Sequence, residues 1–146
     1  MEILGKSSLA FLETYINNCA PLGAEMKGQE IWLDRVKGYS DEITQDIYGN
    51  SARILNPDGK LRVAISAHAD VVSWMVSQVT KKGFLYVVPN GGTDPVSAPA
   101  MEVVVHSKEG SIPGIFGWPA IHIRKDKKNL IPDKEHLFID CGFSGR

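Results

Sequence analysis

A histidine and a carboxylate two residues apart, His68 and Asp70, are the side chains whose types and spacing best fit chemistry. A neutral imidazole is a common ligand for zinc and other first-row metals. A nearby carboxylate can fix which ring nitrogen carries the proton. The pair therefore predicts a metal ligand with an orienting partner. A metal site needs three or four ligands, and no other residue nearby has ligand spacing, so a structural or surface histidine is the alternative on spacing alone.

The pair follows an apolar run, residues 61–67, in which Leu61, Val63 and Ile65 alternate with more polar or smaller residues. Alternation of this kind is typical of a β-strand. Because α/β enzymes hold reacting groups just beyond the carboxyl ends of their strands, this run is the element expected to position His68 and Asp70.

The other nucleophiles and histidines lack such a pattern. Cys19 and Cys141 lie far apart and have no metal, redox or catalytic spacing. The N-terminus has an early acid and no apolar core before a cleavage site, so no secretory signal peptide is expected. Reduced thiols and a cytoplasmic location follow from both observations. Three further histidines are interpreted as ordinary surface or interface residues: His106, His122 and His136.

Composition excludes two classes of partner. The net charge of −1 gives no electrostatic footprint for nucleic acid. No apolar run approaches the roughly 20 residues that a membrane span needs. A hydrophobic fraction of 43% and a charged fraction of 23% are ordinary for a globular chain, so a packed core is expected.

The first half of the chain predicts two helices and then strands. Ser7 or Ser8 can cap a helix that ends at residues 17–18, and a second helix is expected over residues 24–37. From residue 41 the period changes, which predicts strands over residues 42–48, 51–55 and 61–67. This order is typical of the opening half of an α/β layer.

The second half predicts only short strands and turns, with a domain boundary near residue 75. The expected strands cover residues 72–77, 84–88, 102–106, 111–116 and 136–140. Strands at this spacing favour a small β-barrel or sandwich. The loop that carries Phe116 and Trp118 is either an exposed contact or a plug of the core.

Several short motifs, taken together, resemble the tetrahedral (glutamyl) aminopeptidase family, whose members are sometimes labelled CelM-type endoglucanases. Each motif is unspecific alone, but their order and spacing match over nearly the whole chain. The motifs are residues 21–23 (Pro-Leu-Gly), 46–50 (Asp-Ile-Tyr-Gly-Asn), 67–70 (Ala-His-Ala-Asp), 90–92 (Asn-Gly-Gly), 114–122 (Gly-Ile-Phe-Gly-Trp-Pro-Ala-Ile-His) and 138–142 (Phe-Ile-Asp-Cys-Gly).

The resemblance implies a fold and an activity. It implies a three-layer α/β/α catalytic domain, here in part over residues 1–75, followed by a β-barrel-like dimerisation domain over residues 76–146. Family members build hollow homo-oligomers and trim amino acids from peptide N-termini with two divalent ions, usually zinc or cobalt. His68 matches the first metal ligand, and Asp70 matches the carboxylate that orients it.

The same resemblance implies that the site is incomplete in these 146 residues. The family's general-base glutamate, bridging aspartate and remaining ligands come later in its chain and have no counterpart here. We therefore expect a truncated portion that holds at most one ion weakly and is inactive alone. Val71 also departs from the acid that usually follows Asp70 in the family.

Two other functions are weighed beside this one. The β-rich portion could be a non-catalytic module that self-associates. The family's alternative label suggests an endoglucanase, but most glycosidases need two carboxyl groups about 5–10 Å apart across a sugar site, and no such pair stands out in the sequence.

Overall fold

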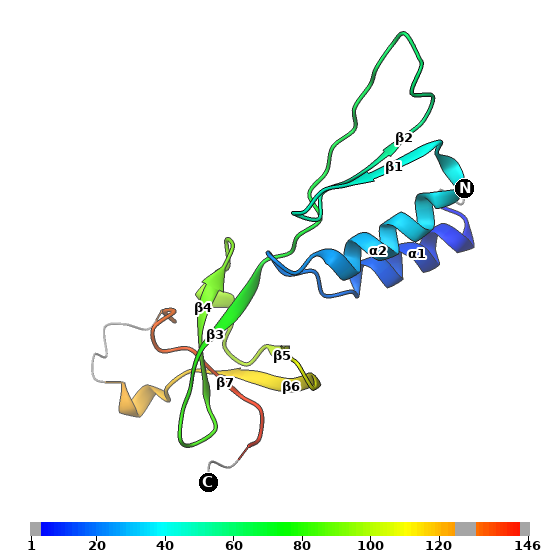
Figure 1. Ribbon diagram of the computed structural model, residues 1–146. Helices are drawn as coiled ribbons and strands as arrows, with labels where there is room; N and C mark the ends of the chain where they lie inside the picture. Colours follow the sequence, from blue (N-terminus) through cyan, green and yellow to red (C-terminus); the bar gives the residue numbers. More distant parts are fainter. Residues whose placement is uncertain (1–3, 125–130, 144–146) are drawn as a thin grey trace. The chain divides into compact units, whose positions relative to one another are not determined.

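The computed structural model describes residues 4–124 and 131–143 (Figure 1). The chain divides into two compact units, Met1–Val71 and Val72–Arg146. The first contains both α-helices and a two-stranded hairpin, and the second contains a five-stranded sheet. The expected mixed α/β composition is therefore confirmed. Within the described residues, no helix has the length and apolar character needed to cross a membrane.

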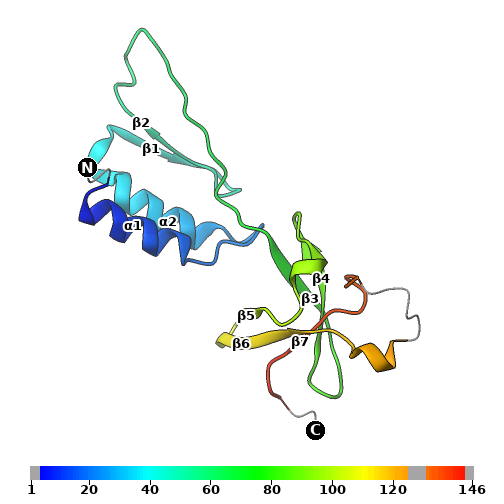
Figure 2. The same ribbon diagram turned by 180° about the vertical axis from the view of Figure 1, so that it is seen from behind.

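Two helices, α1 (Lys6–Ile16) and α2 (Met26–Val36), run side by side in the first unit (Figures 1 and 2). The 3₁₀-helix η1 (Lys37–Tyr39) extends α2. Arg35 of α2 joins the pair, because its guanidinium donates to Ser8 Oγ at 3.3 Å and lies 5.6 Å from the centre of the Phe11 ring. The prediction of a serine cap is wrong: Gly5 is the N-cap of α1, without a side-chain cap, and Ser8 bonds to α2 instead.

The hairpin pairs β1 (Glu42–Gln45) with β2 (Ser51–Ile54) in antiparallel register. Asp46 closes its turn. One carboxylate oxygen accepts the backbone N–H groups of Tyr48 and Asn50, and the other accepts the Asn50 side chain. A carboxylate that binds the backbone two residues on is typical of a turn. The predicted strand over residues 42–48 is therefore too long, because the turn begins at Asp46.

The predicted strand over residues 61–67 is wrong as a hydrogen-bonded element of this chain. The segment is extended but has no strand assignment, and the sheet described in this unit contains only β1 and β2. Its apolar side chains face solvent, with Leu61 84%, Val63 77% and Ile65 97% exposed. An alternating pattern records which face of a strand is apolar, but the strand itself forms only where a neighbour offers backbone hydrogen bonds.

The second unit is one antiparallel sheet in the order β3-β4-β7-β6-β5. Tight turns join β3 to β4 and β5 to β6, as the sequence predicts, and β7 lies between the two hairpins. The sheet curls, so that β3 and β4 run across the direction of β6 (Figure 1). Its strands are β3 (Ser73–Val79), β4 (Leu85–Asn90), β5 (Glu102–Ser107), β6 (Gly110–Gly117) and β7 (Phe138–Asp140).

The core of this unit lies on one face of the sheet. Leu137 is fully buried, and Phe116 packs edge to face on Trp74 with 5.4 Å between ring centres. Phe116 is 4% exposed, so the core-plug interpretation holds for this residue and the exposed-contact interpretation is wrong. The buried cluster consists of Val87, Ala98, Phe116, Leu137 and Ile139. Alternate residues of each strand point into it, which is why the alternation in the sequence predicted these strands well.

Candidate metal centre

The structure brings the two residues of the predicted pair into contact. Nδ1 of His68 lies 3.1 Å from the backbone carbonyl oxygen of Asp70 and 3.4 Å from its Oδ1. A carbonyl oxygen can only accept a hydrogen bond, so this contact assigns the ring proton to Nδ1. In the neutral imidazole with this tautomer, the opposite nitrogen, Nε2, carries the lone pair. The His68 side chain is 86% exposed, so this lone pair is open to a ligand.

The backbone after Asp70 is tied to the loop that follows α1. The N–H of Val71 donates to the carbonyl of Ala20 at 2.9 Å, and Pro21 forms a parallel bridge with Val71. A pocket of about 150 Å³ lies between the end of α1 and this segment, lined partly by Asn18, Ala20 and Ala69. Backbone contacts of this kind, and not the predicted strand, position the pair in this chain.

The pair fits a metal as one ligand and its support, not as a complete site. A neutral imidazole with a bonded Nδ1–H presents Nε2 to a divalent ion, which is the usual arrangement of a metal-bound histidine. Across residues 4–124 and 131–143, no three His, Cys, Asp or Glu side chains gather closely enough to hold an ion. His68 and Asp70 therefore offer one ligand of a candidate metal centre and the partner that orients it.

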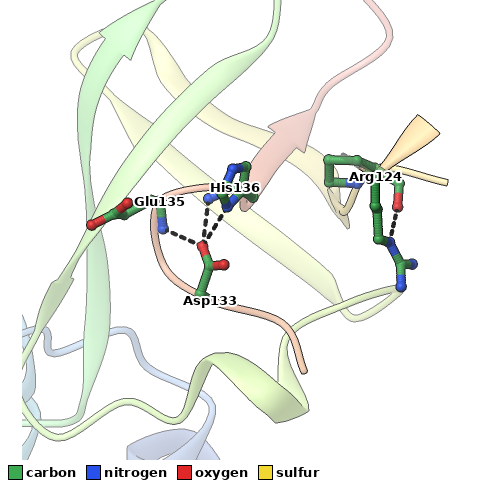
Figure 3. A network of polar contacts seen from close by, with 5 residues as sticks. Arg124, Asp133, Glu135 and His136 are labelled. Carbon is green, nitrogen blue, oxygen red and sulfur yellow. Dashed lines mark hydrogen bonds and ion pairs between the residues drawn. The ribbon is translucent and has the colours of Figure 1, made fainter. Parts of the chain in front are cut away.

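Two of the other three histidines, His106 and His136, have local side-chain partners. His106 Nδ1 lies 3.4 Å from the Ser111 hydroxyl across the β5–β6 hairpin. His122 belongs to the short 3₁₀-helix η3 (Ile121–Ile123). His136 lies with its Nδ1 2.7 Å from Asp133 Oδ1 (Figure 3). None of the three belongs to a ligand cluster in the described part of the chain.

Asp133 organises the turn that precedes β7. Its Oδ1 also accepts the backbone N–H groups of Glu135 and His136 (Figure 3). The side-chain hydrogen bond with His136, followed by these backbone bonds, lowers the pKa of Asp133. Nearby, Arg124 donates through Nε to the Pro119 carbonyl at 2.7 Å and covers the Trp118 ring. These contacts shape loops and assemble no catalytic constellation.

The two cysteines are free. Cys19 is exposed and follows α1, and Cys141 is partly buried after β7. Burial raises the pKa of the Cys141 thiol, with a smaller contribution from the Asp140 carboxylate. Such a shift disfavours the thiolate that a nucleophile would need.

Comparison with known proteins decides the family. The family model of the M42 glutamyl aminopeptidases matches residues 49–146, more than half of the chain, and this range contains His68 and Asp70. The chain belongs to the M42 glutamyl aminopeptidase family. The resemblance stated from the sequence is thereby confirmed.

The curated relatives are much longer than this chain. Lysyl aminopeptidase of Pyrococcus furiosus is 28% identical over 120 residues, which cover 81% of this chain and 34% of that protein. The putative aminopeptidase FrvX of Escherichia coli is 28% identical over 141 residues, which cover 95% of this chain and 39% of that protein. The chain thus spans less than half the length of the curated relatives it matches.

Solved structures of longer proteins share the fold of this chain. The TET aminopeptidase of a marine sediment thaumarchaeote aligns with a TM-score of 0.91 and 26% identity, covering 97% of this chain and 40% of that one. A Thermotoga maritima protein named endoglucanase aligns with a TM-score of 0.74 and 27% identity, covering 92% and 39%. The Pyrococcus horikoshii TET1 peptidase, which can assemble into a tetrahedron or a large octahedral shell, shares the fold at a TM-score of 0.80 and 23% identity, covering 94% and 41%.

Proposed function

We propose that this chain is part of a metal-dependent aminopeptidase that removes amino acids from the N-termini of peptides. Family membership supports the reaction class. The observation that carries the proposal is the hydrogen bond from His68 Nδ1 to Asp70, because it leaves Nε2 open as a ligand at the position where the family motif has its first metal ligand.

Each residue of the pair has a distinct task. His68 would hold a divalent ion through Nε2. Asp70 keeps the ring proton on Nδ1 through its carbonyl oxygen and stabilises the ring through its carboxylate, 3.4 Å away. When bound, a pair of ions, zinc or cobalt, would polarise the peptide carbonyl and lower the pKa of a water toward neutrality.

The remaining ligands and the general base are proposed to come from outside these 146 residues. The exposed apolar segment 61–67 supports this, because it has the pattern of a strand but lacks a neighbour. In a complete cytoplasmic enzyme we place it within the sheet of a three-layer α/β/α domain. The 146-residue chain alone would then hold at most one ion, weakly, and would hydrolyse no peptide.

Cobalt titration of the purified chain, followed by NMR of the histidine rings, tests the ligand. We expect Co²⁺ to perturb the His68 ring before the other histidine rings, and His68→Ala to remove this response. His106→Ala is the matched control, since His106 is also exposed but bonds only to a hydroxyl. A response that survives His68→Ala would contradict the assignment.

An activity assay tests the second part of the proposal. The chain is expected to release no product from an aminoacyl-anilide at any metal concentration. Hydrolysis by the purified 146-residue chain that His68→Ala abolishes would show that the site is complete without further residues, and the proposal of an inactive portion would fail.

A self-associating module is the second candidate function, and one face of the sheet favours it. The strand register places Val104, Ile115 and Val88 on the face opposite the core. These side chains are 57%, 52% and 45% exposed. An apolar groove of about 1040 Å³ crosses part of this face, between Val104 of β5 and Phe138 of β7. Exposed apolar side chains beside an apolar groove often mark an interface.

Sedimentation measures this association. We expect the chain to form dimers or larger species, and Val104→Lys to shift it toward monomer. Val96→Lys is the control, because Val96 is 53% exposed but lies in the 3₁₀-helix η2 (Pro95–Ser97), outside the sheet. A chain that stays strictly monomeric at high concentration would argue against this candidate.

A further inference from the structure

One peptide group joins the candidate ligand to the helical part of its unit. The carbonyl oxygen of Asp70 accepts His68 Nδ1–H, and the N–H of Val71 donates to the Ala20 carbonyl. These two groups belong to the same peptide bond, which is planar and rigid. A movement of the Ala20 carbonyl therefore turns the acceptor that holds the His68 ring. The two bonds also polarise each other, because a chain of hydrogen bonds strengthens its members.

Helix α2 packs closely against Ala20, the residue whose carbonyl accepts the Val71 N–H. Ala20 is 5% exposed, and Gly28 is the buried residue of α2. A Cβ atom on Gly28 would lie 3.2 Å from the Ala20 Cβ and 3.0 Å from Asn18 Nδ2. Both distances are tighter than normal contacts, so a side chain at this position would displace the loop. Glycine weakens a helix interior relative to alanine, and the close approach of α2 to Ala20 accounts for its presence here.

We propose that Gly28 is a positioning residue for the His68–Asp70 pair. By letting α2 approach Ala20, it fixes the Ala20 carbonyl, the Asp70–Val71 peptide group and, through that group, the His68 ring. The inference rests on the proposed function, because the ring it positions is the proposed metal ligand. Gly28 lies outside the family motifs and far from His68 in sequence, and it acts only through backbone groups.

Gly28→Ala tests the role, with a matched control and a designed rescue. The methyl group that Gly28→Ala introduces should push the Ala20 loop away. Gly28→Ala combined with Ala20→Gly removes the Ala20 methyl group that the new side chain meets, and Asn18 Nδ2, at the end of a flexible side chain, can turn aside, so the double variant should restore the contact. Gly38→Ala is the control, because a Cβ atom at Gly38, in η1, has no neighbour within 4 Å. Circular dichroism of all three variants should show helix content equal to or above that of the wild type, since alanine favours helix.

Two measurements on the 146-residue chain report the effect. The first is hydrogen exchange at the Val71 amide, which should become about 10-fold faster in Gly28→Ala as its acceptor moves. The second is the Co²⁺ concentration that half-saturates the response of the His68 ring, which should rise about 10-fold, as for loss of a partner that orients a ligand. The double variant should return both values to within about 2-fold of the wild type, and Gly38→Ala should leave both unchanged.

The outcomes separate this inference from the proposed function. If Val71 exchange and the His68 Nδ1 resonance are the same in Gly28→Ala as in the wild type, the positioning role is refuted. If both change and the double variant restores them while Co²⁺ perturbs no histidine ring even in the wild type, Gly28 positions the pair but His68 as a metal ligand is refuted. If Gly28→Ala loses Val71 amide protection or Co²⁺ affinity and Ala20→Gly fails to restore it, this also counts against the inference.

Discussion

The two units differ in how far they bury their apolar side chains. In Val72–Arg146, five buried residues form one cluster, and every strand of the sheet finds its neighbours within the unit. In Met1–Val71, Ala20 is the buried hydrophobic residue of the described part, while Leu61, Val63 and Ile65 lie in solvent. The difference shows that an apolar alternating pattern becomes part of a core where neighbouring strands pair with it.

The candidate chemistry lies in the unit with fewer buried apolar residues. His68 follows the exposed run of residues 61–67, so the residue proposed to hold a metal depends on a segment without sheet neighbours. Its anchor is a backbone bond to Ala20, and not a strand on each side. The second unit, in contrast, has the better packing but no cluster of ligands among its described residues.

Core truncation should give the largest difference between the units. Leu137 is fully buried, so Leu137→Ala removes its packing and leaves a cavity, at a cost of about 2–5 kcal/mol of unfolding free energy. Ile65 is 97% exposed, so Ile65→Ala should change this free energy by no more than about 0.5 kcal/mol. Urea unfolding measures both. Equal losses would show that residues 61–67 are packed in solution, and the comparison would fail.

Removal of the Arg53 guanidinium should give the next largest loss of unfolding free energy. Arg53 of β2 donates to the Leu33 carbonyl of α2 at 3.5 Å and to the Ser40 hydroxyl. Arg53→Ala is expected to cost about 1.5–3 kcal/mol, because a charged donor and its acceptors lose their bonds.

Arg62→Ala is the control for this anchor, since Arg62 is itself exposed and makes a solvent-exposed bond to the Pro57 carbonyl, and it should cost under about 0.5 kcal/mol. Thermal unfolding separates the two variants. An Arg53→Ala chain as stable as the wild type would mean that the hairpin and α2 are held together by other contacts.

The exposed apolar run itself can be made polar at little cost. Replacing Leu61, Val63 and Ile65 with threonine should reduce binding of an apolar dye such as ANS, and each change should alter stability by at most about 0.5 kcal/mol. The matched control replaces Val87 with threonine, which should destabilise the sheet because Val87 is 4% exposed. Unchanged dye binding in the triple variant would show that ANS binds to apolar surface outside residues 61–67.

The same contrast explains what the sequence predicted. The strands of the second unit were predictable, because each alternating run pairs with a neighbour in the same chain and contributes side chains to the buried cluster or packs against it. The run 61–67 carries an equally clear pattern but no partner, so the strand prediction failed. Asp46 marks a turn that was included in a strand, because its own hydrogen bonds and not hydrophobic spacing decide the fold there.

The candidate site was predictable only in part. A histidine two residues before an aspartate predicts an orienting contact between them, and the structure places the two in contact. The anchor of this pair was not predictable. It joins the backbone of Ala20 to that of Val71, and backbone groups carry no residue signature. Gly28 is visible in the sequence, but as one glycine among 14 it gives no sign of the loop it packs against.

The smallest expected effect is on the pKa of two carboxyl groups, each of which closes a turn, one turn in each unit. A side-chain hydrogen bond from Asn50 lowers the pKa of Asp46, and one from His136 lowers the pKa of Asp133, each below its ordinary 3.8. A lowered carboxyl pKa stabilises the fold above pH 3.8, and this contribution disappears as the pH falls through the folded-state value. Asn50→Ala and His136→Ala should each raise the pKa of the partner carboxyl toward 3.8, as measured by NMR titration of the carboxyl carbons.

The surroundings of the two turns should make their responses to acid unequal. Asp133 lies four residues before the fully buried Leu137, so packing holds the start of β7 after the carboxylate is protonated. Asp46 closes a hairpin whose tip residues Ile47 and Tyr48 are 93% and 81% exposed, so little else holds that turn. Amide exchange, corrected for its intrinsic pH dependence, should therefore accelerate in β1 and β2 before β7 as the pH falls below 3.8. Acceleration of β7 first would mean that the hairpin has stabilising contacts stronger than those of the sheet core.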